Sequence, residues 1–203
     1  MYKLILLMAK IQTSKNGTKK EVIIEKAALL FKTKSYSAAS MRELAEMLGV
    51  EAPSLYNHIG SKSELLQAIC FKVGNKFSTQ IEMIEKSPVN VVTKIEAIIR
   101  FHIKTMLENF DEVFVANHEW KHLKDPYLSD FLNIRRGYEK SLINLIEKGI
   151  VSNEIKTTNS YVAALTILSA VRGIEFWQRN KKNVSAQILE DDMVDHLLNG
   201  IKN

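Results

Sequence analysis

Apolar residues recur at intervals of three and four along most of this 203-residue chain, and no stretch alternates with the period of two that is typical of a strand. Only 3 Pro and 8 Gly interrupt the pattern, which favours long helices over many turns. We therefore predict an all-α protein. In the second half of the chain the expected helices span residues 92–110, 113–123, 127–148, 159–180 and 185–199.

Helix starts in the first third of the chain are marked by three capping boxes, in which a Ser or Thr precedes a Glu by three positions. The box at Thr18 opens a helix that fades near the stretch KTKSYSAA. The box at Ser40 opens a helix of barely two turns, which Gly49 ends. The box at Ser61 opens a longer helix over residues 62–86, and Pro88 ends it.

Between these helices lies the short polar segment GVEAPSLYNHIG, residues 49–60. Residues 52–58 fit one short helix with Pro53 in its first turn, where the missing N–H has no partner to lose. Val50 and Leu55 are expected to pack inward, so the polar side chains form an outer face. Two short helices joined by a glycine turn make a helix-turn-helix, whose second helix enters the major groove of DNA.

The positive charge of the chain is concentrated near the N-terminus. The net charge is +5, and up to Asn75 there are 11 Lys and Arg against 6 Asp and Glu. The remaining 128 residues carry 17 of each kind. This asymmetry suggests a polyanion-binding module joined to a neutral one, although a solvated lysine surface would give the same counts.

Composition excludes several other classes of protein. The single cysteine, Cys70, excludes an intrachain disulfide framework and a cysteine-based zinc finger, and fits a buried residue in a reducing compartment. The apolar run from Leu4 to Met8 is too short for a membrane span or a signal-peptide core. We expect a cytoplasmic protein without membrane association. Residues 1–17 are expected to form a flexible basic arm that includes an over-extended translation start.

The stretch AASMRELAEMLGVEAPSLYNHIGSKSELL, with the pattern Ala27-x-x-Leu30-Phe31 before it, resembles the DNA-binding domain of the TetR family of bacterial repressors. Ser35 stands where that family has a glycine. The resemblance implies a three-helix DNA-binding domain over residues 18–66 and a helical effector-binding and dimerisation domain over residues 67–203. It further implies a homodimer held by the last two long helices of each chain, with a small-molecule pocket in each C-terminal domain.

On the expected recognition helix, the two residues before Ser54 can contact thymine methyl groups, and Ser54 can bond a base or a phosphate. Asn57 is the candidate for bidentate reading of adenine. The resemblance implies that Tyr56 and His58 face the DNA backbone. The predicted contacts on this helix are Ala52, Pro53, Ser54, Tyr56, Asn57 and His58.

The remaining DNA contacts are expected from the flanking helices. Ser40 caps a helix whose free N–H groups suit a phosphate. Lys62 is predicted to clamp a phosphate from the start of the next helix. The other predicted cationic contacts are Lys19, Lys20 and Arg42.

For the C-terminal domain, apolar walls with a few polar groups are what a small-molecule site requires. The predicted pocket residues are His102, Phe114, His118, Glu119, Trp120, Tyr138, Phe176 and Trp177. The helix over residues 159–180 is apolar all round and needs a second partner. The predicted dimer contacts are Ile167, Ala170, Gly173, Ile174, Met193 and Leu197.

A competing chemistry is offered by residues 118–122, HEWKH, which match H-E-x-x-H. In metalloproteases the two histidines of this pattern bind zinc and the glutamate activates water. No nearby third ligand is obvious in the sequence. The histidines could instead bind a metal or an anionic ligand together with His102, or lie in the core or in solvent. We assign no metal and no cofactor.

The sequence thus predicts a DNA-binding transcriptional repressor, not an enzyme, that a small and possibly hydrophobic effector releases from a pseudo-palindromic operator. An activator would differ only in which state binds DNA. The alternatives are a DNA-binding architectural protein without an effector, which predicts no usable cavity, and a zinc hydrolase that uses His118, Glu119 and His122.

Overall fold

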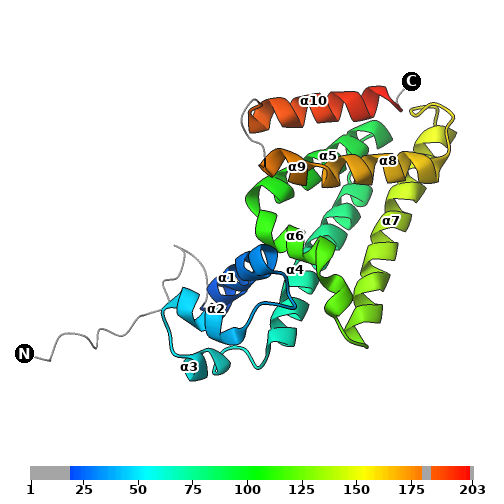
Figure 1. Ribbon diagram of the computed structural model, residues 1–203. Helices are drawn as coiled ribbons and strands as arrows, with labels where there is room; N and C mark the ends of the chain where they lie inside the picture. Colours follow the sequence, from blue (N-terminus) through cyan, green and yellow to red (C-terminus); the bar gives the residue numbers. More distant parts are fainter. Residues whose placement is uncertain (1–18, 180–183, 202–203) are drawn as a thin grey trace, which may run out of the picture.

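The computed structural model describes residues 19–179 and 184–201, and its elements are helices only, as predicted. Figure 1 shows α1, α2 and α3 at one end of the molecule and α8, α9 and α10 at the other, with α4 and α7 running between them. The helices are α1 (Lys19–Lys34), α2 (Met41–Leu48), α3 (Ala52–Tyr56), α4 (Lys62–Lys86), α5 (Val91–Glu108), α6 (Phe110–His118), η1 (Trp120–His122, a 3-10 helix), α7 (Tyr127–Val151), α8 (Ser160–Arg172), α9 (Ile174–Arg179) and α10 (Ala186–Asn199).

The helix-turn-helix forms where the sequence predicted it. The Ser40 hydroxyl accepts a hydrogen bond from the Glu43 N–H at 3.2 Å, and the Glu43 carboxylate accepts one from the Ser40 N–H at 2.9 Å, so this capping box is complete. Gly49 ends α2 with φ of 66°, a left-handed conformation that costs glycine least. Leu55 is fully buried beneath α3, which leaves the other face of that helix outside.

One local feature around this unit differs from expectation, and a second accounts for a departure from the family pattern. Ser61 caps α4, but the Glu64 carboxylate accepts from the Gly60 N–H at 2.8 Å and not from Ser61, so the third box is only half formed. Ser35 adopts φ of 68°, which explains why glycine is usual there in the resembling family. Thr18 and the predicted arm over residues 1–17 lie outside the described residues.

One apolar core runs through both halves of the described chain, from Ile23 in α1 to Leu198 in α10. Helix α4 has the predicted bounds, and it packs against α1, α6 and α7. Cys70 on α4 is fully buried as expected, and burial raises the pKa of its thiol to about 12. The DNA-binding unit is therefore joined to the rest of the molecule through packed side chains and not through a linker.

Several predicted helix boundaries were wrong. The recognition helix expected over residues 52–58 ends at Tyr56, the helix expected over residues 92–110 ends at Glu108, and the helix expected from residue 113 begins at Phe110. Three further differences lie in the C-terminal domain. Helix α7 continues past Gly149 to Val151. Gly149 allows close packing and does not end the helix, since a Cβ there would lie 2.6 Å from Ile155 Cδ1. The apolar helix expected over residues 159–180 divides at Gly173, whose N–H is shared between the carbonyls of Ser169 and Ala170. The helix expected over residues 113–123 ends at His118 and continues as η1.

Among the described residues, no helix combines the length and the apolar character that crossing a membrane requires.

Candidate nucleic-acid interface and interior cavity

The outer face of α3 presents polar side chains that have no hydrogen-bond partner within the described chain. Tyr56 is 51% exposed, and Ser54, Asn57 and His58 are exposed beside it. Pro53 is exposed in the first turn, whereas Ala52 is half-buried against the core. Because α3 lies at the end of the molecule (Figure 1), these donors and acceptors are free to meet an external partner.

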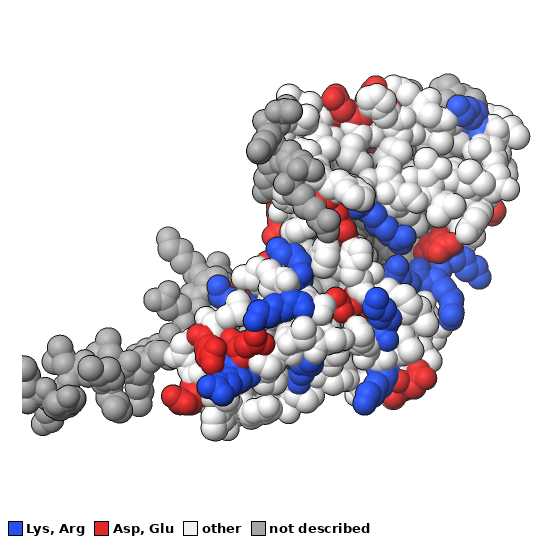
Figure 2. All heavy atoms as spheres, in the orientation of Figure 1, with Lys and Arg blue, Asp and Glu red and all other residues white. Residues whose placement is uncertain are grey.

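Cationic side chains surround this face. Lys19 and Lys20 are exposed at the start of α1, and Lys20 lies 3.6 Å from the Glu64 carboxylate. The side chain of Arg42 is 86% exposed on α2 and forms an ion pair with Glu46 in the same helix. Such exposed pairs contribute little and leave the cation available. Figure 2 shows most of the Lys and Arg on this face over the lower half of the molecule, with Asp and Glu interspersed among them, whereas the upper half is mostly uncharged.

The structure gives Lys62 a different role from the predicted phosphate clamp. Its ammonium group donates to the carbonyl oxygens of Tyr36 and Ala39, each at 2.8 Å, and to that of Ser37 at 3.4 Å. It also lies 4.6 Å from the centre of the Tyr36 ring. All three N–H donors are engaged, so Lys62 holds the connection between α1 and α2 and does not point to solvent.

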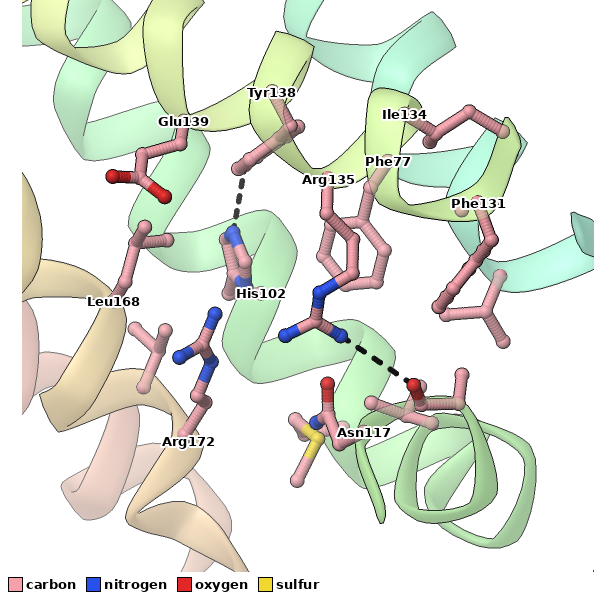
Figure 3. Close-up of a pocket in the computed structure, with 16 residues that line it drawn as sticks. Phe77, His102, Asn117, Phe131, Ile134, Arg135, Tyr138, Glu139, Leu168 and Arg172 are labelled. Atoms are coloured by element: carbon pink, nitrogen blue, oxygen red, sulfur yellow. Dashed lines mark hydrogen bonds between the residues drawn. The ribbon is translucent and has the colours of Figure 1, made fainter. Parts of the chain in front are cut away.

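An interior cavity of about 230 Å³ lies in the C-terminal domain. Figure 3 shows the side chains that converge on it from α4, α5, α6, α7 and α8. Its apolar wall comprises Val73, Phe77, Met106, Val113, Phe131, Ile134, Leu168 and Val171, and its polar residues are His102, Asn117, Arg135, Tyr138, Glu139 and Arg172.

His102 and Tyr138 form a polar pair on one wall of the cavity, with His102 Nε2 2.7 Å from the Tyr138 hydroxyl (Figure 3). Burial, and secondly the positive charge of Arg172, lower the pKa of His102 to about 3. Burial raises the pKa of Tyr138. Both groups are therefore neutral at pH 7. Either group can replace the hydrogen bond between them with one to a ligand.

The pKa of His102 predicts a loss of stability in acid. The unfolded chain takes up a proton near pH 6.5, whereas the folded chain does so only near pH 3, so stability falls as the pH drops through that window. Between pH 7 and pH 5 His102 should lower the free energy of unfolding by about 2 kcal/mol. Urea unfolding at both pH values checks this, with His102→Gln as the variant that should lack this increment. Equal pH dependence in the two proteins would contradict the assignment.

Two arginines face each other at one side of the cavity. Arg135 on α7 and Arg172 on α8 direct their guanidinium groups toward the space near His102 (Figure 3). Neither forms an ion pair within the described chain; Arg135 donates only a long bond of 3.5 Å to the Ala116 carbonyl. Burial and the charge of Arg172 lower the pKa of Arg135. The cavity thus holds two positive charges, with Glu139 as the one carboxylate in its wall.

The arginine pair also borders a second, more open hollow of about 370 Å³. Asn117, Arg135 and Arg172 line both spaces. The outer hollow is completed by His118, Ser169, Gly173, Glu175 and Phe176. A ligand held by the arginines can therefore extend from the inner cavity toward solvent.

The predicted pocket residues divide into three groups. His102 and Tyr138 line the inner cavity, and His118 and Phe176 line the outer hollow. Phe114, Glu119, Trp120 and Trp177 line neither. Sequence reasoning missed the two arginines, although Arg172 is the one cation in an otherwise apolar stretch, and such an exception was the available signal.

The H-E-x-x-H pattern is not arranged as in a metalloprotease. Helix α6 ends at His118 and Glu119 caps it, so His118 and His122 do not share one helix. His118 Nε2 lies 2.8 Å from the Glu175 carboxylate on α9, whereas the His122 ring stacks on Tyr36. Within the described ranges no group of three or more His, Cys, Asp or Glu side chains is placed to hold a metal ion.

The predicted dimer contacts need one correction. Ile167 and Ile174 are each only 1% exposed, because they pack into the core of their own chain. Ala170, Gly173, Met193 and Leu197 are half-buried. The large apolar side chains that α8, α9 and α10 leave exposed are different ones, namely Tyr161, Val162, Leu165, Phe176 and Ile188.

A helix-turn-helix joined through one long helix to a cavity-bearing helical domain defines a class of DNA-binding transcription regulators. Residues 23–69 match the family described as bacterial regulatory proteins, tetR family, and residues 88–201 match the tetracyclin repressor-like, C-terminal domain. The chain belongs to the TetR family of transcriptional regulators.

Similar proteins are known in sequence and in structure. The HTH-type transcriptional repressor KstR2 of Mycolicibacterium smegmatis is 18% identical over 150 residues, 73% of each chain. The ketosteroid transcriptional regulator KstR2 of Mycobacterium tuberculosis superposes with a TM-score of 0.86 at 17% identity, covering 96% of this chain and 100% of that one. AibR, solved with isovaleryl coenzyme A and operator DNA, gives a TM-score of 0.78 at 24% identity over 88% of this chain and 97% of that one.

Proposed function

We propose that the protein is a homodimeric repressor that a small-molecule effector releases from a pseudo-palindromic operator. The observation that carries the proposal is that α4 belongs to both sites. Its first residue, Lys62, secures the helix-turn-helix, and Val73 and Phe77 further along it line the cavity. A ligand that favours one position of α4 would therefore favour one position of the recognition helix.

A second chain of contacts connects the cavity with the DNA-binding unit. The Arg135 guanidinium lies 5.6 Å from the Trp120 ring in η1. His122, in the same short helix, stacks on Tyr36 with ring centres 5.2 Å apart. Tyr36 in turn lies against Lys62. Movement of Arg135 on binding a ligand is thus passed to the connection between α1 and α2.

The dimer is supported by the exposed apolar face of α8, α9 and α10. Tyr161 and Val162 are each 52% exposed, Leu165 is 47% exposed and Phe176 is 72% exposed. Exposed apolar side chains grouped in this way mark a protein interface. This face lies at the end opposite α3 (Figure 1), so a twofold axis there would leave both recognition helices free to contact two half-sites.

The alternatives receive less support. An architectural DNA-binding protein without an effector predicts a solid C-terminal domain, whereas the cavity walls enclose about 230 Å³. A zinc hydrolase needs His118 and His122 to converge, and their rings have separate partners.

A gel-shift titration against the DNA upstream of the gene for this protein tests the proposal, with random DNA as competitor at two salt concentrations. We expect specific binding that weakens steeply as salt rises, because Lys and Arg contacts to phosphate release counterions. Isovaleryl coenzyme A and a panel of short acids are then added to the complex. If the protein does not bind DNA even at low salt, the proposal that it is a transcription regulator is refuted. If it binds DNA and no small molecule changes that binding, the architectural alternative is favoured.

A further inference from the structure

We propose that the cavity takes an organic anion with a compact apolar group, the anion lying between Arg135 and Arg172 and the apolar group among the inner walls. This names the chemical class of effector, and it rests on the proposed function only in treating the bound molecule as an effector. The proposal is drawn from four features of the described residues: charge, pairing, shape and access.

The charge argument begins with the side chains themselves. Two guanidinium groups on different helices converge on one space, where Arg135 is half-buried and Arg172 is exposed at the boundary with the outer hollow. Neither has a carboxylate within 4 Å among the described residues, although Glu139 is near enough to act on Arg135 at longer range. Like charges held close together repel, all the more where one of them is partly removed from water, and an anion between them offsets that cost. Planar guanidinium forks are suited to carboxylate and phosphate groups.

The nearby acidic groups do not take this place. Glu175 borders the outer hollow, but its carboxylate lies 2.8 Å from His118 Nε2. Figure 3 shows the Glu139 carboxylate directed away from the Arg135 guanidinium group. Burial keeps His102 neutral at pH 7, so it adds a hydrogen-bonding group but no charge. The net charge of the side chains that line the inner cavity is therefore positive.

Shape limits the rest of the ligand. The inner cavity of about 230 Å³ is smaller than the roughly 300–1,000 Å³ of most drug-sized sites, so it admits a compact group. Its walls of Phe77, Met106, Phe131 and Leu168 favour an apolar one. The outer hollow begins at the same arginines, so a larger polar part attached to the anion can remain near solvent. A short-chain carboxylic acid and a phosphate-bearing thioester of such an acid both meet this description.

Two dyes of the same ring system test the inference directly. 8-Anilinonaphthalene-1-sulfonate carries a sulfonate, and N-phenyl-1-naphthylamine has the same rings without the charge. Rings of this size would occupy both the inner cavity and the outer hollow, which meet at the two arginines. We expect the wild-type protein to bind the sulfonate dye at least tenfold more tightly than the neutral dye, measured by fluorescence titration. Arg172→Gln should weaken binding of the sulfonate dye at least tenfold and change binding of the neutral dye less than twofold.

The matched control is Arg136→Gln. Arg136 is the neighbour of Arg135 on α7, is exposed, and donates to Asn133 in the same helix. The Arg136→Gln variant loses the same charge as Arg172→Gln, but outside the cavity, so its binding of both dyes should not change. Arg135→Lys is a second variant, because Arg135 packs on Trp120 and Phe131 and its glutamine variant could be less stable. The lysine variant keeps the positive charge. The difference in binding free energy between the sulfonate dye and the neutral dye should therefore stay above half of the wild-type value. Circular dichroism melts verify that each variant is folded.

Displacement of the dye then identifies the source of the anion. Displacement by isovalerate indicates a free carboxylate, whereas displacement by isovaleryl coenzyme A and not by isovalerate indicates the phosphates of the carrier. Equal binding of the two dyes by the wild-type protein, or unchanged binding of the sulfonate dye by folded Arg172→Gln, would overturn the proposal. The assay contains no DNA. If an anion binds through the arginines but leaves the operator complex intact, the proposed anion site is supported and the proposed response to an effector is refuted.

Discussion

Replacing Asn57 with alanine is expected to weaken binding to the operator about 30-fold or more while leaving binding to random DNA nearly unchanged. Asn57 is exposed at the C-terminal end of α3, and its side chain has no hydrogen-bond partner within the described chain. A bidentate contact between an amide and adenine contributes about 1–3 kcal/mol of discrimination. A homodimer loses two such contacts, so the total is about 2–6 kcal/mol.

The control for this prediction is Asn133→Ala. Asn133 is likewise exposed but lies on α7, where its side chain accepts a hydrogen bond from Arg136. Its replacement should leave both kinds of binding unchanged. Competition gel shifts with specific and random duplexes measure the ratio of the two affinities. Retention of the full ratio in Asn57→Ala would show that another residue of α3 reads the operator.

Replacing Leu165 with aspartate is expected to dissociate the dimer at micromolar concentration and to abolish tight operator binding with it. Leu165 is 47% exposed on α8, in the middle of the apolar face that we assign to the interface. In a twofold interface each substitution occurs twice, and an unpaired carboxylate there costs several kcal/mol to bury. Sedimentation velocity measures the change from dimer to monomer.

Val151→Asp provides the comparison. Val151 is 85% exposed at the end of α7, outside the apolar face of α8, α9 and α10, and the change introduces the same charge. This variant should remain dimeric and bind DNA normally. A Leu165→Asp protein that sediments as a dimer at the same concentration would place the interface elsewhere.

Local signals in the sequence were sufficient for most of the fold. The complete capping box at Ser40 and the left-handed Gly49 fix the bounds of α2, and α4 has the predicted ends. These features depend on residues close together in the chain, which is why they can be recognised without a structure. Gly149 was read as a helix stop because its role depends on Ile155 and Val91, and their approach is not visible in a helical pattern.

The candidate sites were harder to predict because they depend on which side of a helix faces which neighbour. Ile167 and Leu165 look equivalent in the apolar run of α8, yet Ile167 is 1% exposed and Leu165 is 47% exposed. Lys62 matched a DNA contact by position, but the carbonyl groups of the connection after α1 take up its donors. Arg135 and Arg172 are far apart in sequence, and only the packing of α7 on α8 brings them to one cavity.

Under the proposed function, the length of α4 would let a small rearrangement at the cavity cause a larger displacement at the DNA-binding end. Gly74, where α4 passes the cavity, lies twelve residues from Lys62, a distance of about 18 Å along a helix axis. A tilt of about 10° around that point would carry the start of α4 through roughly 3 Å. The two arms of a dimer would together change the reach between recognition helices by up to about 6 Å, against the roughly 34 Å that separates successive major grooves. Hydrogen bonds to bases tolerate only tenths of an ångström, so on the proposed mechanism a rigid arm would convert a side-chain rearrangement into loss of register on the operator.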